Sequence, residues 1–149
     1  MQLNIGNAAP DFTGKDQDSN PIRLSDYKGR KVLLYFYPKD DTSGCTAQAC
    51  NLNENLPELE KAGYQTIGVS VDDEKSHRKF IEKHNLKFPL VADTDRSAVE
   101  LYGVWKEKSM YGRKYMGTMR TTFLMDESGI ITDIISKVDT KNHAAQVLK

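Results

Sequence analysis

Cys45 and Cys50 are the two side chains of this chain best suited to covalent chemistry, because a deprotonated thiol is a strong nucleophile. Along an ideal α-helix, five positions turn the second side chain by about 500° and place the two Cα atoms roughly 8.6 Å apart. A disulfide needs Cα atoms within about 7 Å of each other. Pairing would therefore require at least one helical turn to unwind. This spacing differs from the C-x-x-C of disulfide oxidoreductases and suits oxidation of Cys45 followed by attack of Cys50.

A strand that leads directly into a helix is expected to position the cysteines. Residues 31–37 form an apolar run without polar alternation, which predicts a strand covered on both faces, and Pro38 ends it. A helical period begins near residue 44 and continues to residue 62. Cys45 is then in the first turn, where unpaired N–H groups and the helix dipole favour a thiolate. Thr42 is placed to cap this helix, and its hydroxyl could face Cys45.

The composition of this helix bears on the unwinding that a disulfide would need. Pro57 removes one backbone donor and predicts a kink or break near Asn53. Asn51, Asn53 and Asn55 are poor helix formers. We expect them to lower the free energy needed to unwind the segment.

Simpler interpretations remain open from spacing alone. The two cysteines could be inert small residues in a helix. Metal binding is disfavoured, because no second pair of cysteines or histidines completes a set of four ligands. The histidines are scattered, and each is expected at the surface: His77, His84 and His143.

The rest of the chain alternates strands and helices. Turn-forming residues at 15–21 predict an N-terminal β-hairpin. Further elements are expected as strands at 64–71, 88–92, 121–125 and 130–138, and as helices at 74–84, 94–102 and 143–149. The polar, basic segment 104–117 is expected to be a loop. This order predicts an α/β fold in one domain over residues 1–149, with a central mixed β-sheet and helices on both faces.

Composition limits the classes of partner. The chain has 21 lysines and arginines and 21 aspartates and glutamates, so no net field favours nucleic acid or anionic lipid. No apolar run approaches the length of a membrane span, and no secretory signal begins the sequence. Because structural disulfides are rare in a reducing compartment, the two cysteines are expected to be catalytic or ligating there. We therefore expect a cytoplasmic protein that binds neither nucleic acid nor membrane.

The residues around Cys45 resemble those of a known family. Pro38-x-x-x-Thr42-x-x-Cys45 is similar to the active-site signature of the peroxiredoxins, thiol-dependent peroxidases with a thioredoxin-like fold. The longer string from Phe36 to Cys50 resembles the bacterioferritin-comigratory, or Q-type, subgroup. Further similarities are Gly-Val-Ser-x-Asp at 68–72, Tyr-Gly-Val-Trp at 102–105, Met-Tyr-Gly at 110–112 and Arg-Thr-Thr-Phe-Leu-Met-Asp at 120–126.

The resemblance implies a role for each matching residue. Cys45 would be the peroxidatic cysteine, and Cys50 would resolve it through an intramolecular disulfide. Thr42 would orient the peroxide and the thiolate, and Pro38 would shield the sulfenate from water. Arg120 would stabilise the thiolate and the charge that develops on oxygen, although by itself this arginine is better explained by a surface ion pair.

The resemblance also implies the partners of the reaction. The substrates would be hydrogen peroxide and organic hydroperoxides, and thioredoxin or a similar dithiol protein would be the reductant. No metal or organic cofactor is implied. Intramolecular resolution does not need a second subunit, so a monomer is expected.

Three positions depart from the subgroup. Ser43 stands where proline is usual, Gln48 where glutamate is usual, and Asn53 where an arginine often occurs. Two alternatives use the same cysteines: a disulfide reductase, which the absent C-x-x-C disfavours, and a redox-sensing or disulfide-exchange module.

Overall fold

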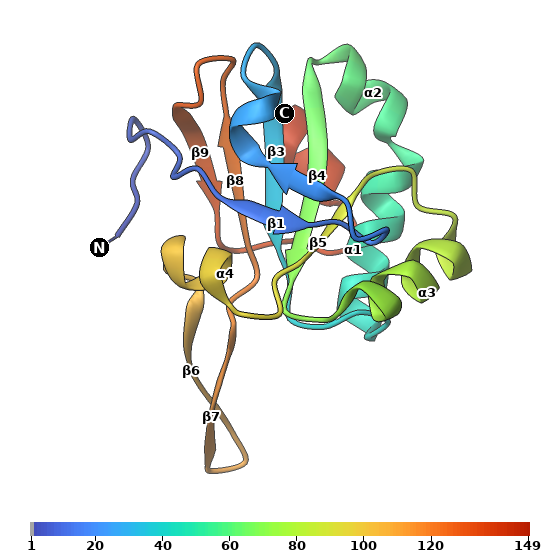
Figure 1. The fold of residues 1–149 in the computed structure, drawn as a ribbon, viewed down its shortest axis with the longest axis vertical. Coiled ribbons are helices and arrows are strands. Elements are labelled where there is room, and N and C mark those ends of the chain that lie inside the picture. The colour runs from blue at the N-terminus through green and yellow to red at the C-terminus, as the bar shows by residue number, and fades with distance from the viewer. Residues whose placement is uncertain (1) are drawn as a thin grey trace.

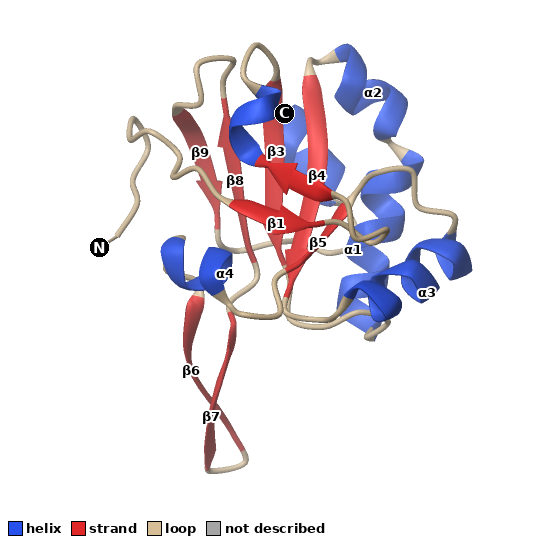
Figure 2. Ribbon diagram, in the orientation of Figure 1, coloured by secondary structure: helices blue, strands red, loops and turns tan. Residues whose placement is uncertain are grey.

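A five-stranded mixed sheet organises the computed structural model, which describes residues 2–149 (Figures 1 and 2). The strand order is β5-β4-β3-β8-β9. The central strand β3 pairs in parallel with β4 and antiparallel with β8. The bounds are β3 Lys31–Phe36, β4 Tyr64–Ser70, β5 Leu90–Ala92, β8 Thr121–Met125 and β9 Ile131–Ile135. The predicted mixed sheet is confirmed.

Both faces of the sheet are covered, as the apolar run of β3 predicts. On one face, Val32, Leu34 and Phe36 pack into a core with the hairpin β1–β2, a 3-10 helix and α4. On the other face, Leu33 and Tyr35 pack into a core with α1, α2, α3 and α5. The covering elements are β1 Thr13–Lys15, β2 Pro21–Arg23, the 3-10 helix Leu24–Tyr27, α1 Ser43–Glu54, α2 Leu56–Lys61, α3 Glu74–His84, α4 Ser97–Leu101 and α5 His143–Leu148.

The predicted break in the long helix is present. The helical segment divides at Asn55 into α1 and α2, and Pro57 lies in the first turn of α2. A proline is tolerated there because the N–H that it lacks has no partner in a first turn. The break was predicted near Asn53 and lies two residues farther along the chain, at Asn55.

The segment 104–117 was wrongly predicted as a loop. It forms an antiparallel hairpin of β6 Trp105–Met110 and β7 Arg113–Thr118, which projects from the body of the molecule (Figure 1). Tyr111 and Gly112 both have positive φ angles, 52° and 77°, as a two-residue type I′ turn requires. Most hairpin side chains are exposed, so no apolar alternation marks these strands in the sequence.

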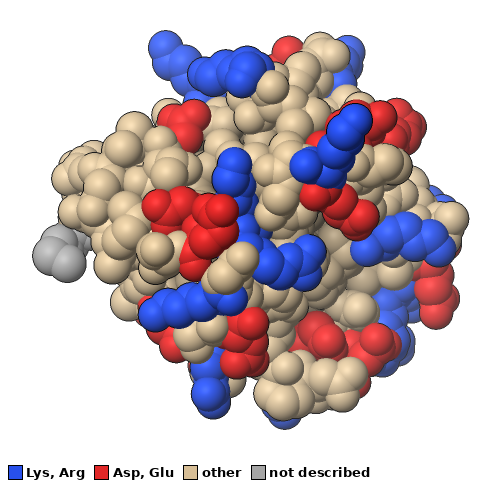
Figure 3. Space-filling model, turned by 90° about the horizontal axis from the view of Figure 1, so that it is seen from above, with Lys and Arg blue, Asp and Glu red and all other residues tan. Residues whose placement is uncertain are grey.

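The distribution of charge on the surface agrees with the equal numbers of basic and acidic residues. Seen from above, basic and acidic side chains alternate across that face, and neither sign forms a continuous patch (Figure 3). Within residues 2–149, none of the helices has the length and apolar character needed to cross a bilayer.

Candidate active site

Cys45 lies in the first turn of α1, just beyond the end of β3. Its side chain is buried, with 1% of its surface exposed, and its thiol is free. Thr42 is the N-cap residue, with extended backbone angles, and its carbonyl accepts the first helical hydrogen bond from the Thr46 amide at 2.8 Å. The N–H groups at the start of the helix therefore favour negative charge at this position.

Arg120 reaches the thiol from a distant part of the chain. It directly precedes β8, and the pairing of Thr121 with Phe36 places it beside the end of β3. Its Nη2 atom donates to Cys45 Sγ at 3.3 Å. A guanidinium keeps its proton at every physiological pH, so it stabilises a thiolate at this distance. Gly44 leaves room for this approach, because a Cβ atom there would lie 3.2 Å from Nη2 and crowd it.

Gln48 holds the other arm of the guanidinium. Arg120 Nη1 donates to Gln48 Oε1 at 2.6 Å, and the Gln48 side chain is fully buried. Its Nε2 atom is buried without a hydrogen-bond partner among the described residues. The sequence marked this position only as a departure from the subgroup. Its place three residues after Cys45, on the same helix face, was the available signal for a role in the site.

Thr42 and Pro38 lie in the loop that joins β3 to α1. The Thr42 hydroxyl donates to the carbonyl of Lys39 at 3.0 Å, and its side chain makes no capping hydrogen bond to α1. The expected side-chain cap is therefore absent, although Thr42 does occupy the N-cap position. Pro38 is half-buried directly after the strand.

Cys50 is half-buried farther along the same intact helix, and its thiol is also free. Burial, and secondarily the charge of Glu54, raise the pKa of Cys50. Cys50 is therefore favoured as a neutral thiol at neutral pH. Because α1 is continuous through both positions, the helical separation expected between the cysteines applies.

The asparagines of α1 do more than weaken a helix. Asn51 donates to the Lys141 carbonyl at 2.9 Å and accepts from the Ala144 amide at 2.8 Å. Asn53 makes a similar pair of bonds with the chain at 85–87, at 3.0 and 2.8 Å. Both residues tie α1 to other elements, which opposes unwinding. Their low helix propensity therefore does not describe their whole effect.

On the β6–β7 hairpin, the pKa of Lys108 responds to the charges of two residues of the site. Burial, and then the charge of Arg120, lower the pKa of Lys108, while the charge of Cys45 opposes this shift. Lys108 thus lies within electrostatic reach of both residues. Nothing in the sequence singles it out, because its segment was predicted as a loop.

Two of the three histidines are not at the surface, contrary to prediction. His77 and His143 have no exposed surface, and His84 is half-buried. Each buried ring has hydrogen-bond partners for both nitrogen atoms. Polar partners that are distant in sequence make this burial possible, and sequence spacing does not reveal them.

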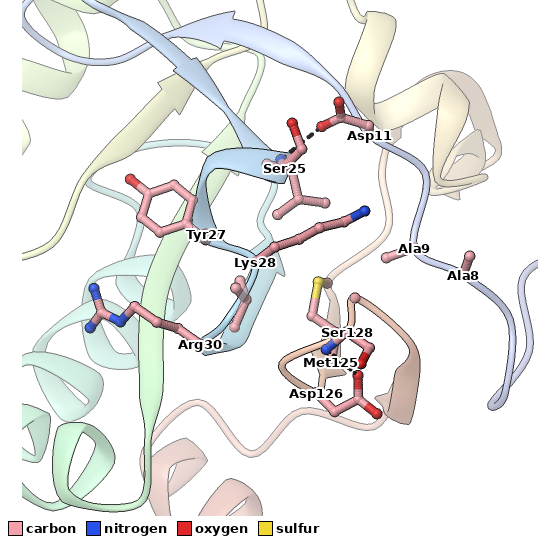
Figure 4. A pocket seen from close by; sticks show the side chains of 13 residues that line it. Ala8, Ala9, Asp11, Ser25, Tyr27, Lys28, Arg30, Met125, Asp126 and Ser128 are labelled. Atoms are coloured by element: carbon pink, nitrogen blue, oxygen red, sulfur yellow. Dashed lines mark hydrogen bonds between the residues drawn. The ribbon is translucent and has the colours of Figure 1, made fainter.

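A separate pocket lies near the start of β3, away from the cysteines. Tyr27, Lys28, Arg30 and Asp126 line it, among others (Figure 4). Cys45, Cys50, Arg120 and Gln48 are absent from its wall. The pocket therefore does not belong to the cysteine site.

Comparison with known proteins identifies the family. The AhpC/TSA family profile matches residues 5–134. Peroxiredoxin Bcp of Escherichia coli is 44% identical over 146 residues, which cover 98% of this chain and 94% of the relative. The chain belongs to the peroxiredoxins, in their Bcp group. Peroxiredoxins are thiol peroxidases, so this peroxiredoxin is an oxidoreductase.

Solved structures place the peroxiredoxin in the same group. PrxQ of Xylella fastidiosa superposes with a TM-score of 0.93 at 35% identity, covering 99% of this chain and 94% of that one. The bacterioferritin comigratory protein of Xanthomonas campestris, described for its alkyl peroxide reduction activity, gives a TM-score of 0.86 at 38% identity and covers 92% and 87%. The predicted thioredoxin-like fold and the recognised subgroup are confirmed.

Proposed function

We propose that Cys45 is the peroxidatic cysteine of this peroxiredoxin and that hydrogen peroxide and organic hydroperoxides are its substrates. The observation that carries this proposal is the 3.3 Å contact from Arg120 Nη2 to Cys45 Sγ at the start of α1. The thiolate attacks one peroxide oxygen, the O–O bond breaks, and the departing oxygen takes a proton to leave as water or an alcohol. Sulfur is oxidised to a sulfenic acid and the peroxide is reduced.

The surrounding residues supply what this step needs. Negative charge moves from sulfur to the departing oxygen, and fixed donors aimed at these atoms lower the barrier. Arg120 offers a charged fork that Gln48 holds in place. The Thr42 hydroxyl would orient the peroxide, and Pro38 would limit the access of water to the sulfenate. The alkyl peroxide activity of the Xanthomonas relative supports the inclusion of organic hydroperoxides.

We assign Cys50 as the resolving cysteine. Its thiol would attack the Cys45 sulfenic acid, form a disulfide within the chain and release water. The two cysteines are too far apart in the intact helix, so α1 must open before this step. Thioredoxin or a similar dithiol protein would then reduce the disulfide. The proposed enzyme is a monomer, because both cysteines come from one chain. It is also proposed to be cytoplasmic.

Replacing Cys45 tests the assignment of the nucleophile. Cys45→Ser should abolish peroxide consumption in an assay with thioredoxin, thioredoxin reductase and NADPH, because an alcohol does not replace a thiolate as nucleophile. Cys50→Ser, which removes the other thiol, is the matched control in a single turnover: it should still consume one equivalent of peroxide, whereas Cys45→Ser should consume none. A Cys45→Ser protein with full turnover would overturn the proposal.

Replacing Cys50 separates resolution from the first step. Cys50→Ser should react once with peroxide and then stop, with Cys45 left as a sulfenic acid that dimedone labels. Mass spectrometry of the wild-type protein after one equivalent of peroxide should show a Cys45–Cys50 disulfide within a monomer. Unchanged thioredoxin-dependent turnover of Cys50→Ser would show that another thiol performs the resolution.

A further inference from the structure

A buried ion pair lies behind the loop that joins β3 to α1. His77 Nδ1 and Asp40 Oδ2 are 2.7 Å apart, and their side chains are 0% and 4% exposed. Asp40 belongs to the loop and is the fifth residue before Cys45, whereas His77 lies on α3. A charge at such depth is unfavourable unless it is paired and hydrogen-bonded, so its partners decide its state.

The hydrogen bonds identify His77 as an imidazolium. Its Nε2 is 2.9 Å from the carbonyl oxygen of Val91, which can only accept, so Nε2 carries a proton. Asp40 accepts hydrogen bonds from the Tyr37 hydroxyl and from Ser76 Oγ, the latter at 2.8 Å, and both bonds stabilise a carboxylate. Nδ1 of His77 then donates to this carboxylate. Both ring nitrogens therefore carry protons.

The electrostatic surroundings agree with this state. Burial lowers the pKa of His77, but the hydrogen bond and charge of Asp40, the Val91 carbonyl and the charge of Asp72 together raise it above its ordinary value. The other titratable group facing the ring is Tyr37. Burial raises the pKa of Tyr37 well above its ordinary value, so its phenol remains a donor to Asp40.

This pair fixes the loop from three directions. His77 and Ser76 hold the Asp40 side chain on α3, the Val91 carbonyl on β5 fixes the ring, and Asp72 after β4 accepts from the Asp40 amide at 2.9 Å. Resting on the proposed role of Cys45, we propose that His77 is a positioning residue: its ion pair with Asp40 holds the loop that starts α1 and places Cys45 against Arg120. His77 acts through the loop and does not touch the thiol.

The same cluster is not a metal site in this protonation state. Asp40, Asp72 and His77 are close enough together for a cation. However, a metal-binding histidine needs a ring nitrogen without a proton, and both His77 nitrogens donate to protein oxygens. The ring and its hydrogen bonds therefore serve the loop.

A matched pair of variants tests the proposal. Asp40→Asn removes the buried charge with little change in shape, and we expect the rate constant for oxidation of the reduced protein by hydrogen peroxide to fall at least about tenfold, because small misplacements of a reacting group are costly. Asp41→Asn is the control. It removes an exposed ion pair with Lys83, in which Nζ and Oδ2 are 2.8 Å apart. We expect the same rate constant to change by less than about twofold.

The pH profile distinguishes positioning from a purely structural role. Loss of the His77 proton should lower the rate on the alkaline side of the profile. In Asp40→Asn this alkaline fall should move to lower pH, since an amide no longer favours the imidazolium. A structural role alone would lower the denaturant midpoint and leave the rate and profile of the folded protein unchanged, and that result would overturn the proposal.

Nitrogen NMR of the wild-type protein gives a test that needs no variant. The ¹⁵N shifts of His77 should be those of an imidazolium at pH 7, and a neutral tautomer would refute the inference. If Asp40→Asn does not fold, Ser76→Ala replaces it, because this change removes one donor to Asp40 and no charge. An unchanged rate in Ser76→Ala would then count against the proposal. Peroxidase assays of Cys45→Ser keep a failure of the proposed function separate from a failure of this inference.

Discussion

Arg120 connects the two residues of α1 that face the reaction. Nη2 contacts Cys45 at 3.3 Å and Nη1 contacts Gln48 at 2.6 Å. A fork with both arms engaged has a fixed direction, so its charge is aimed at Cys45 Sγ. Substitutions of either Arg120 or Gln48 should therefore change the rate of sulfenate formation.

Replacement of Arg120 should slow the first step. Arg120→Met removes the charge and the donors, and we expect the rate constant for oxidation by hydrogen peroxide to fall by about 10²–10³, as for the loss of one preorganised donor in other enzymes. The rate constant of Arg120→Lys should lie between those of the wild type and Arg120→Met, because an ammonium group keeps the charge but lacks the two-armed geometry of a guanidinium. Stopped-flow measurements at pH 7 compare the three proteins. Equal rates for Arg120→Met and the wild type would contradict this role.

Gln48→Glu should also slow the reaction. The new carboxylate would share the charge of Arg120 and add a negative charge near Cys45, so the guanidinium would stabilise the reacting sulfur and oxygen atoms less. We expect the rate constant for oxidation by hydrogen peroxide to decrease by up to about tenfold, which corresponds to about 1.4 kcal/mol of lost stabilisation. Stopped-flow measurements compare this variant with the wild type. A faster oxidation of Gln48→Glu would show the opposite effect.

At the scale of elements, α1 has two opposing tasks. In the proposed cycle its first turn must be wound to stabilise the Cys45 thiolate, and it must unwind for Cys50 to reach the sulfenic acid. The break at Asn55 leaves α1 short, but Asn51 ties it to α5 and Asn53 ties it to the chain after α3. These tertiary hydrogen bonds set how easily the helix opens.

Removal of the Asn51 tie should speed resolution. Asn51→Ala deletes two hydrogen bonds to the start of α5, worth about 1 kcal/mol each, and should accelerate disulfide formation about 5- to 30-fold without changing sulfenate formation. Asn55→Ala is the control, because among residues 2–149 the Asn55 side chain bonds only to the Asn51 carbonyl, at 2.8 Å, within its own turn. Quenched-flow mass spectrometry follows both steps. A slower or unchanged second step in Asn51→Ala would contradict the assignment.

At the scale of the whole molecule, the partners of the two buried histidines favour a protonated ring for His77 and a neutral ring for His143. His77 faces two acceptors, the Asp40 carboxylate and the Val91 carbonyl, and must donate from both nitrogens. His143 faces the Gln146 amide oxygen at 2.8 Å and the Thr122 hydroxyl at 2.7 Å, and a hydroxyl can donate to a neutral ring.

The pKa shifts of these two histidines predict a stability maximum. The pKa of His77 is raised, so its contribution is complete below about pH 6.5 and is lost as the pH rises through the raised value. Burial lowers the pKa of His143, so its contribution is complete above about pH 6.5 and is lost as the pH falls through the lowered value. Each group changes the free energy of unfolding by up to about 1.4 kcal/mol per pH unit.

Urea titrations at several pH values measure this dependence. The free energy of unfolding should decrease on both sides of a maximum, and His143→Gln should flatten the acid side while leaving the alkaline side unchanged. An effect of His143→Gln on the alkaline side alone would contradict a neutral His143 in the folded protein.

The sequence by itself determined the features that depend on neighbouring residues. An apolar run followed by Pro38 predicted β3, helical spacing placed Cys45 at the start of α1, and Pro57 predicted the division from α2. These features follow from local backbone geometry and side-chain periodicity, which a single chain displays directly. The β6–β7 hairpin was missed because its exposed strands lack the alternation that burial imposes.

Only the tertiary structure decided which distant residues meet at the site. Without the family resemblance, Arg120 was better explained by a surface ion pair, and pairing of β8 with β3 brings it to Cys45. The burial of His77 against Asp40 and the anchoring of Asn51 on α5 likewise depend on contacts between remote segments. Such contacts carry no periodic signal, because each one depends on how separate elements pack together. Local pattern thus located Cys45, the proposed nucleophile, and packing decided what surrounds it.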